Sequence, residues 1–206
     1  MIETTHVLNY SIQKIVGEVS EGKVKKICEN GFSVSNFING QFAQFVHTGT
    51  GDILILAQNQ IVYAVTAANV DSCLADSGKV VDVFGIILGI LMLEGSNSNV
   101  EMALERSYPS HGNTFQRSLS LLREDFSTSI GSQFIGFRIP FIKEVFQGEV
   151  RMEPFFSDPS RYFLGCKMVT RQPCKIEEAT RIWTDMTKMI TEELEPLVGR
   201  LFEEES

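Results

Sequence analysis

Several features that mark common enzyme classes are missing from this chain. Its 206 residues include only three histidines, His6, His47 and His111, which lie far apart and lack the spacing of metal ligands. There is no Gly-x-Ser-x-Gly elbow, so an α/β-hydrolase arrangement has no support. The glycine turn at residues 49–51 precedes a predicted strand and no lysine follows it, unlike a P-loop. We therefore expect neither a metal site nor a cofactor.

Cysteines are few and scattered. Cys28, Cys73, Cys166 and Cys174 form no Cys-x-x-Cys pair and are too sparse for a disulfide scaffold. Residues 1–9 are polar, and no apolar run follows them, so we expect no signal peptide. Both observations favour a reducing, cytoplasmic location.

Long apolar runs are also missing. The least polar stretch, residues 80–93, is too short for a membrane span, which needs roughly 20 apolar residues. We therefore expect no membrane association. Gly85 and Gly89 lie four residues apart in this stretch, which favours a buried, closely packed helix. A buried strand remains the alternative, because periodicity does not separate the two.

Basic residues are outnumbered. The chain has 18 Lys and Arg against 26 Asp and Glu, for a net charge of −8 and an isoelectric point near 5.0. A surface with this excess of negative charge repels phosphate backbones. Nucleic acid is therefore an unlikely partner.

The C-terminal half shows the clearest pattern. Residues 133–142, 149–156 and 161–171 each alternate apolar with charged or polar side chains, which is typical of strands with one buried face. A long amphipathic helix is predicted next, because apolar residues recur every three or four positions. Pro196 cannot donate a backbone hydrogen bond, so we expect a kink or break there. The apolar positions of this helix are Ile176, Ala179, Trp183, Met186, Ile190, Leu194, Leu197 and Leu201.

The N-terminal half gives a mixed pattern. Residues 52–66 predict a hairpin with its turn at 58–59, and residues 69–76 predict a short helix. Short helices are also expected near residues 37–49, 100–107 and 113–126, the last capped by Asn113, while residues 4–28 stay ambiguous. The predicted class is α+β: an antiparallel C-terminal sheet packed on a long helix, with a smaller hairpin-and-helix N-terminal unit. We divide it at residues 1–95 and 96–206; one continuous domain is the alternative.

A basic face is the first functional candidate. Between residues 131 and 175 the chain has seven basic and four acidic residues, although its overall charge is negative. The alternating pattern places Arg138, Arg151, Lys167 and Arg171 on the charged side of the predicted sheet. Such a face can bind a small anionic ligand or an acidic partner protein. Ordinary cross-strand ion pairs on a solvated surface are the competing interpretation.

Cys174 is the one catalytic candidate. It lies at the predicted start of the long helix, between Arg171 and Lys175, where a helix N-terminus and nearby cations lower a thiol pKa. A nucleophilic or redox-active cysteine is therefore the alternative to a binding function. The sequence supports a non-enzymatic binding or adaptor protein first, because no catalytic spacing occurs. We expect a homodimer that meets through the C-terminal half, since three strands are too few to cover the long helix.

Overall fold

One antiparallel sheet runs through the whole molecule. In the computed structural model, which describes residues 6–93, 95, 97–121 and 134–202, the strand order is β2-β3-β4-β5-β1-β6-β9-β8-β7. The first strand of the chain therefore lies in the middle of the sheet, between β5 and β6. The strands are β1 (His6–Gln13), β2 (Phe32–Ile38), β3 (Phe42–His47), β4 (Ile53–Ala57), β5 (Gln60–Val65), β6 (Asn99–Pro109), β7 (Phe137–Ile142), β8 (Phe146–Pro154) and β9 (Arg161–Thr170).

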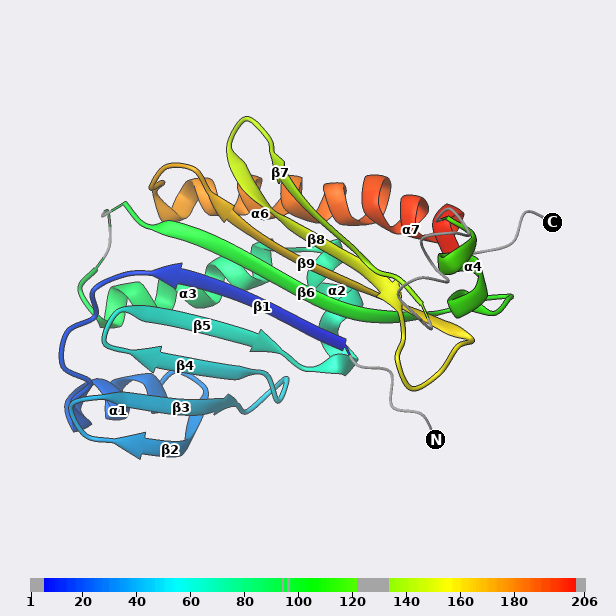
Figure 1. The fold of residues 1–206 in the computed structure, drawn as a ribbon. Coiled ribbons are helices and arrows are strands. Elements are labelled where there is room, and N and C mark those ends of the chain that lie inside the picture. The colour runs from blue at the N-terminus through cyan, green and yellow to red at the C-terminus, as the bar shows by residue number, and fades with distance from the viewer. Residues whose placement is uncertain (1–5, 94, 96, 122–133, 203–206) are drawn as a thin grey trace.

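The helices form a second layer on one face of this sheet (Figure 1). The N-terminal part of this layer holds α1 (Glu21–Cys28), the 3-10 turn η1 (Ala67–Asn69), α2 (Val70–Ala75) and α3 (Gly78–Ile90). The C-terminal part holds α4 (Thr114–Ser120) and one helical run made of α6 (Ile176–Lys188), the π-helical segment η2 (Met189–Leu194) and α7 (Glu195–Phe202). The opposite face of the sheet, towards the viewer in Figure 1, carries no helix among the described residues.

The core lies between the two layers and is continuous from one end of the sheet to the other. Trp183 of α6 is fully buried at its centre, and its ring packs on Tyr10 of β1 and Phe84 of α3, with centroids 5.1 and 5.3 Å away. The sheet buries the apolar face of α6 and η2 within the same chain, Met186 and Ile190 included. The long helix therefore needs no second copy to cover it, and our reason for a dimer through the C-terminal half is wrong.

The α+β class, the antiparallel C-terminal sheet and the long helix are confirmed. The hairpin at 52–66, the helix at 69–76 and a helical rather than extended segment after residue 80 are confirmed as well. The Asn113 side chain caps α4 by accepting hydrogen bonds from the N–H groups of Phe115 and Gln116. The predicted end of that helix lies outside the described residues.

Two predicted helices are strands. The segment near residues 37–49 forms the β2–β3 hairpin, and residues 100–107 lie within β6. Gly40 occupies the hairpin turn with a φ of +79°, a conformation that glycine adopts without the strain a Cβ causes. In β6 the buried residues Val100, Met102 and Leu104 alternate with outward-facing ones. The ambiguous residues 4–28 contribute β1 and α1.

Pro196 does not end the helix. The departure from α-helical geometry falls earlier, in the π-helical segment η2, and Pro196 is the second residue of α7. A proline inside a helical run lacks the N–H that would donate to the preceding turn, and here it follows the π-helical segment, where the regular α-helical hydrogen bonding is already interrupted. The chain therefore stays helical from Ile176 to Phe202.

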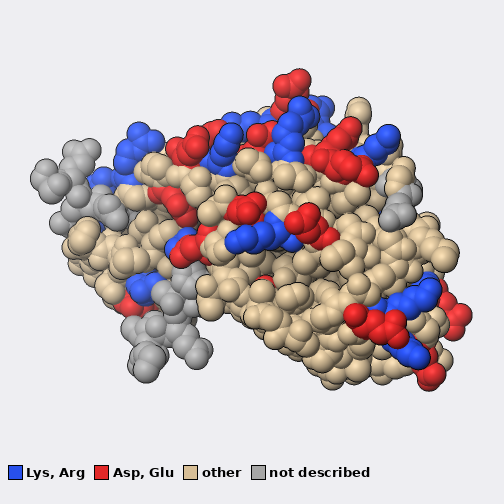
Figure 2. Space-filling model, turned by 180° about the vertical axis from the view of Figure 1, so that it is seen from behind, with Lys and Arg blue, Asp and Glu red and all other residues tan. Residues whose placement is uncertain are grey.

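Charged side chains avoid much of the helical layer. Viewed from behind (Figure 2), they gather along the upper edge, where α6 lies, in a group near the centre of the face and at the lower right over α1, with mostly uncharged surface between these groups. The apolar side chains of Ile86 and Met92 are exposed in the α3 region. The division proposed at residue 95 falls in the connector between α3 and β6, and it stays a prediction; β1 and β6 pair across it.

Candidate functional site

The structure brings three of the four predicted basic residues together. Arg138 on β7, Arg151 on β8 and Lys167 on β9 all lie on the open face of the sheet, the face without helices. Arg171 lies just beyond β9 and donates to the backbone carbonyls of Lys143 and Glu144, at 3.5 and 3.4 Å. It lines a different cavity, next to Cys174.

Each of the three cations has a glutamate partner. Arg138 Nε lies 2.6 Å from Glu149 Oε1, and Lys167 Nζ lies 3.2 Å from Glu101 Oε1. The hydrogen bond and charge of Glu149 raise the pKa of the Arg138 guanidinium. The cationic state of Arg138 is therefore favoured by Glu149, with which it is already paired within the chain.

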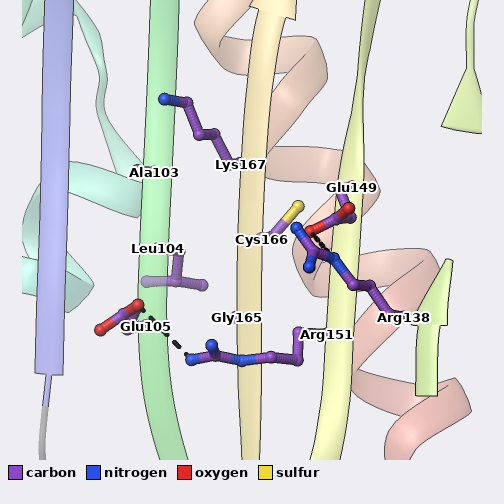
Figure 3. A pocket seen from close by; sticks show the side chains of 9 residues that line it. All are labelled: Ala103, Leu104, Glu105, Arg138, Glu149, Arg151, Gly165, Cys166 and Lys167. Carbon is purple, nitrogen blue, oxygen red and sulfur yellow. Dashed lines mark ion pairs between the residues drawn. The ribbon is translucent and has the colours of Figure 1, made fainter. Parts of the chain in front are cut away.

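Arg151 lies flat across the neighbouring strand. It sits directly opposite Arg138 in the register of β7 and β8, and like charges in that position repel. Its guanidinium turns the other way and reaches Glu105 on β6, with Nη2 and Oε1 3.7 Å apart (Figure 3). Glu153 adds a second contact at 3.5 Å, and the guanidinium lies 4.7 Å from the centre of the Phe163 ring.

Small residues leave room for this arrangement. Gly165 on β9 and Ala103 on β6 form the floor of a depression of about 230 Å³, whose rim is built from the charged side chains (Figure 3). A Cβ atom at Gly165 would lie 2.9 Å from Cε1 of Phe163. A larger residue there would displace the aromatic ring on which Arg151 rests.

A second depression continues the first along β7 and β8. It measures about 480 Å³, shares Arg138, Glu149 and Lys167 with the first, and adds the apolar side chains of Ile142 and Val169. We call the two depressions together the charged groove. The groove and its ion pairs hold three cations (Arg138, Arg151, Lys167) and four carboxylates (Glu101, Glu105, Glu149, Glu153). Its charges are largely compensated, so it suits a partner that carries both signs of charge.

The sequence analysis missed half of the carboxylate partners. Glu101 and Glu105 come from β6, which we predicted as a helix. The signal was present, because Val100, Met102 and Leu104 alternate with polar or small residues as they do in β8 and β9. Reading that alternation would have placed both glutamates on the charged face.

Cys174 does not have the properties of a reactive cysteine. The residue is buried, and its backbone exchanges two hydrogen bonds with Ser98, at 2.8 and 2.9 Å. Burial raises the pKa of the thiol, and the charge of Glu178 raises it further. Our expectation of a lowered pKa is wrong because the cysteine precedes the helix in a bridge to another segment, where Lys175 is the N-cap of α6.

The rate at which each cysteine is alkylated should therefore follow the exposure of its thiol. All four cysteines are free thiols, and only Cys28 is partly exposed. We expect iodoacetamide at pH 8 to modify Cys28 first, and Cys174 more slowly than a small model thiol, because burial and a raised pKa both reduce the accessible thiolate. Peptide mass spectrometry over time measures both rates. Fast modification of Cys174 in the folded protein would restore it as a catalytic candidate.

Comparisons with known proteins do not assign a family. No family model and no curated protein matches this chain. One solved structure, a rolling circle replication initiator protein from Geobacillus stearothermophilus, aligns over 89% of this chain and 80% of its own, at 11% identity and a TM-score of 0.28.

Within the described residues, no helix is long and apolar enough to cross a membrane, and no cluster of three metal-binding side chains occurs.

Proposed function

We propose that this chain is a non-enzymatic cytoplasmic binding protein that acts as a homodimer, and that two copies meet through the open face of β1 to β5. The observation that carries the proposal is that this part of the face has no charged side chain. Register fixes three outward-facing rows, each crossing β1, β5, β4, β3 and β2. The rows are Gln13-Gln60-Ala57-Phe42-Ile38, Ser11-Val62-Ile55-Gln44-Asn36 and Asn9-Ala64-Ile53-Val46-Ser33.

We call these rows the uncharged face. Ser11 is buried, and the other fourteen positions are partly or fully exposed. Charged residues make up 21% of the chain and belong mostly on surfaces, so fourteen such positions would ordinarily hold about three. The charges begin one strand further on, with Glu101 and Glu105 of β6. Interfaces between proteins differ from other surface chiefly by the depletion of charge at their centre. The uncharged face has this property and the charged groove does not.

A second copy is the occupant that the charge distribution favours. Two chains of net charge −8 repel one another, and the repulsion is smallest where neither brings a charge into the contact. Two sheets pack face to face about 10 Å apart, and a two-fold axis uses the same patch of both copies. Both charged grooves would then remain open at the ends of the assembly. We propose that each charged groove binds a partner surface with both acidic and basic side chains. The charges of the partner would replace the internal ion pairs of the groove.

A single lysine should disrupt this dimer. Ile55 lies in the middle row of the uncharged face, on the central strand β4 of the five. We expect wild-type protein to sediment as a dimer at micromolar concentration and Ile55→Lys as a monomer, because the variant buries two unpaired charges in the contact. Ile86→Lys on the exposed side of α3 is the matched control and should remain dimeric.

The salt dependence of association distinguishes this contact from one made by ion pairs. Association through the uncharged face should persist at 0.5 M salt, whereas contact through the charged groove would weaken as charges are screened. A wild-type chain of 23.1 kDa that remains monomeric at 100 µM would overturn the homodimer. A dimer that Ile55→Lys leaves intact would place the contact elsewhere.

A further inference from the structure

We propose that another cavity, on the helical side of the sheet, binds a small primary amine with an apolar body. The cavity measures about 270 Å³ and lies between the β3–β4 turn, β5, α2 and the first turns of α3. It is separate from both surfaces described above, because the sheet stands between them. Its floor holds Asp52, and its walls include Tyr63, Val80 and Val83.

Asp52 is a buried carboxylate held by donors from three segments. Its side chain accepts from the Tyr63 hydroxyl at 2.9 Å, from the Thr66 N–H at 2.7 Å and from the Thr66 hydroxyl at 3.0 Å. Asn69 Nδ2 adds a fourth hydrogen bond at 2.9 Å. Three of these four reach Oδ1, and the Tyr63 hydroxyl reaches Oδ2. Since a carboxylate oxygen accepts two hydrogen bonds readily, Oδ2 can take one more donor.

The carboxylate keeps its negative charge. Burial acts to raise its pKa, but the hydrogen bonds from Thr50, Asn69, Thr66 and Tyr63 outweigh burial and hold the pKa below its ordinary value. In the part of the chain that the structure describes, no lysine, arginine or histidine forms an ion pair with Asp52. A buried charge without an opposite charge is unusual in proteins. A ligand ammonium group would supply the missing cation and the further donor to Oδ2.

The rest of the cavity defines the body of the ligand. Val80 and Val83 of α3 give the wall an apolar surface, which excludes a second charged group from the interior. Lys79 lies on the lining as well, but its side chain is exposed and its Nζ donates to the Ser72 hydroxyl at 3.2 Å. The volume accommodates a branched chain of about five carbons with one amino group. A carboxylic acid of the same shape would face Asp52 and be repelled.

Two isosteric probes test the charge. We expect 3-methylbutylamine to shift the backbone amide signals of Asn69, Val80 and Val83 in ¹H–¹⁵N spectra, saturating with a dissociation constant of about 1 mM, which is typical of six heavy atoms. The neutral isostere 3-methylbutan-1-ol should bind at least tenfold more weakly. Equal binding of the two would overturn the proposal, because it would leave Asp52 without a part in recognition. No saturable shift with the amine at 20 mM would overturn it as well.

A cavity-filling variant tests the location. Asp52 itself holds the fold together, so its replacement would not separate binding from folding. Val83→Phe fills the cavity from α3 without touching the hydrogen bonds of Asp52, and it should weaken amine binding at least tenfold with little change in the unfolding midpoint. Ile86→Phe, one turn later and outside the cavity, should bind the amine as wild type does. Undiminished binding to Val83→Phe would place the amine elsewhere and overturn the assignment.

Discussion

Trp183→Ala is expected to lower the free energy of unfolding by about 3–5 kcal/mol, the range for deleting a large aromatic side chain from a packed core. Trp183 is fully buried, and it joins three parts of the molecule. Its ring contacts Tyr10 edge to face and Phe84 at a tilt, and its Nε1 donates to the Glu101 carbonyl at 3.2 Å. The substitution therefore opens a cavity and removes the indole donor from the Glu101 carbonyl.

Urea denaturation followed by far-UV circular dichroism measures this loss. Trp183→Phe keeps most of the ring volume but loses the hydrogen bond, so it should fall between alanine and wild type. Ile15→Ala is the control, because Ile15 is exposed on a loop and its removal should change the unfolding free energy by less than about 0.5 kcal/mol. A loss below about 1 kcal/mol for Trp183→Ala would contradict the central packing of α6.

Asp52→Asn is expected to destabilise the fold by about 2–3 kcal/mol at pH 7, since hydrogen bonds to a charged group contribute more than neutral ones. The carboxylate joins the start of β4 to the Thr66–Asn69 turn after β5. The amide nitrogen of asparagine is a donor, and it would face other donors there. Asp185→Asn on α6 is a control of the same chemistry at a partly exposed position.

The destabilisation should depend on pH in a defined direction. The folded-state pKa of Asp52 lies below its unfolded value, so its contribution is complete above about pH 5 and is lost as pH falls through the folded pKa. The difference between wild type and Asp52→Asn should therefore shrink between pH 5 and the acid limit of folding. Urea unfolding at a series of pH values measures it. A difference that stays constant into acid would mean that Asp52 is not ionised in the folded protein.

Alternation along single strands made the C-terminal sheet predictable. In β8 an apolar side and a mostly charged side alternate along the strand. In β9 the buried side is regular, although Phe163, Gly165 and Val169 share the other side with the charged residues. Both strands and the common side of Arg151 and Lys167 could therefore be inferred. The spacing of Phe37, Phe42 and Phe45 suggested a helix instead. The stronger signal there was Asn39-Gly40, a dipeptide typical of hairpin turns. Local spacing of apolar residues gave the wrong answer where turn chemistry gave the right one.

The partners of the charged residues could not be predicted, because they depend on which strands are neighbours. Nothing in the sequence places β6 beside β9, yet Glu105 and Glu101 reach Arg151 and Lys167 only through that pairing. Cys174 shows the same limit. Its position before a helix was read correctly, but the bridge to Ser98 that buries it joins segments 76 residues apart.

The central place of β1 has a consequence for the order of folding during synthesis. One edge of β1 pairs with β5, while the other waits for β6, which follows 86 residues after Gln13 in the register and 100 residues after His6. At ribosomal rates of about 5–20 residues per second, that edge stays unpaired for several seconds. An unpaired strand edge recruits other chains. A nascent N-terminal half would therefore depend on chaperones, and a fragment ending near residue 95 should aggregate where the whole chain does not.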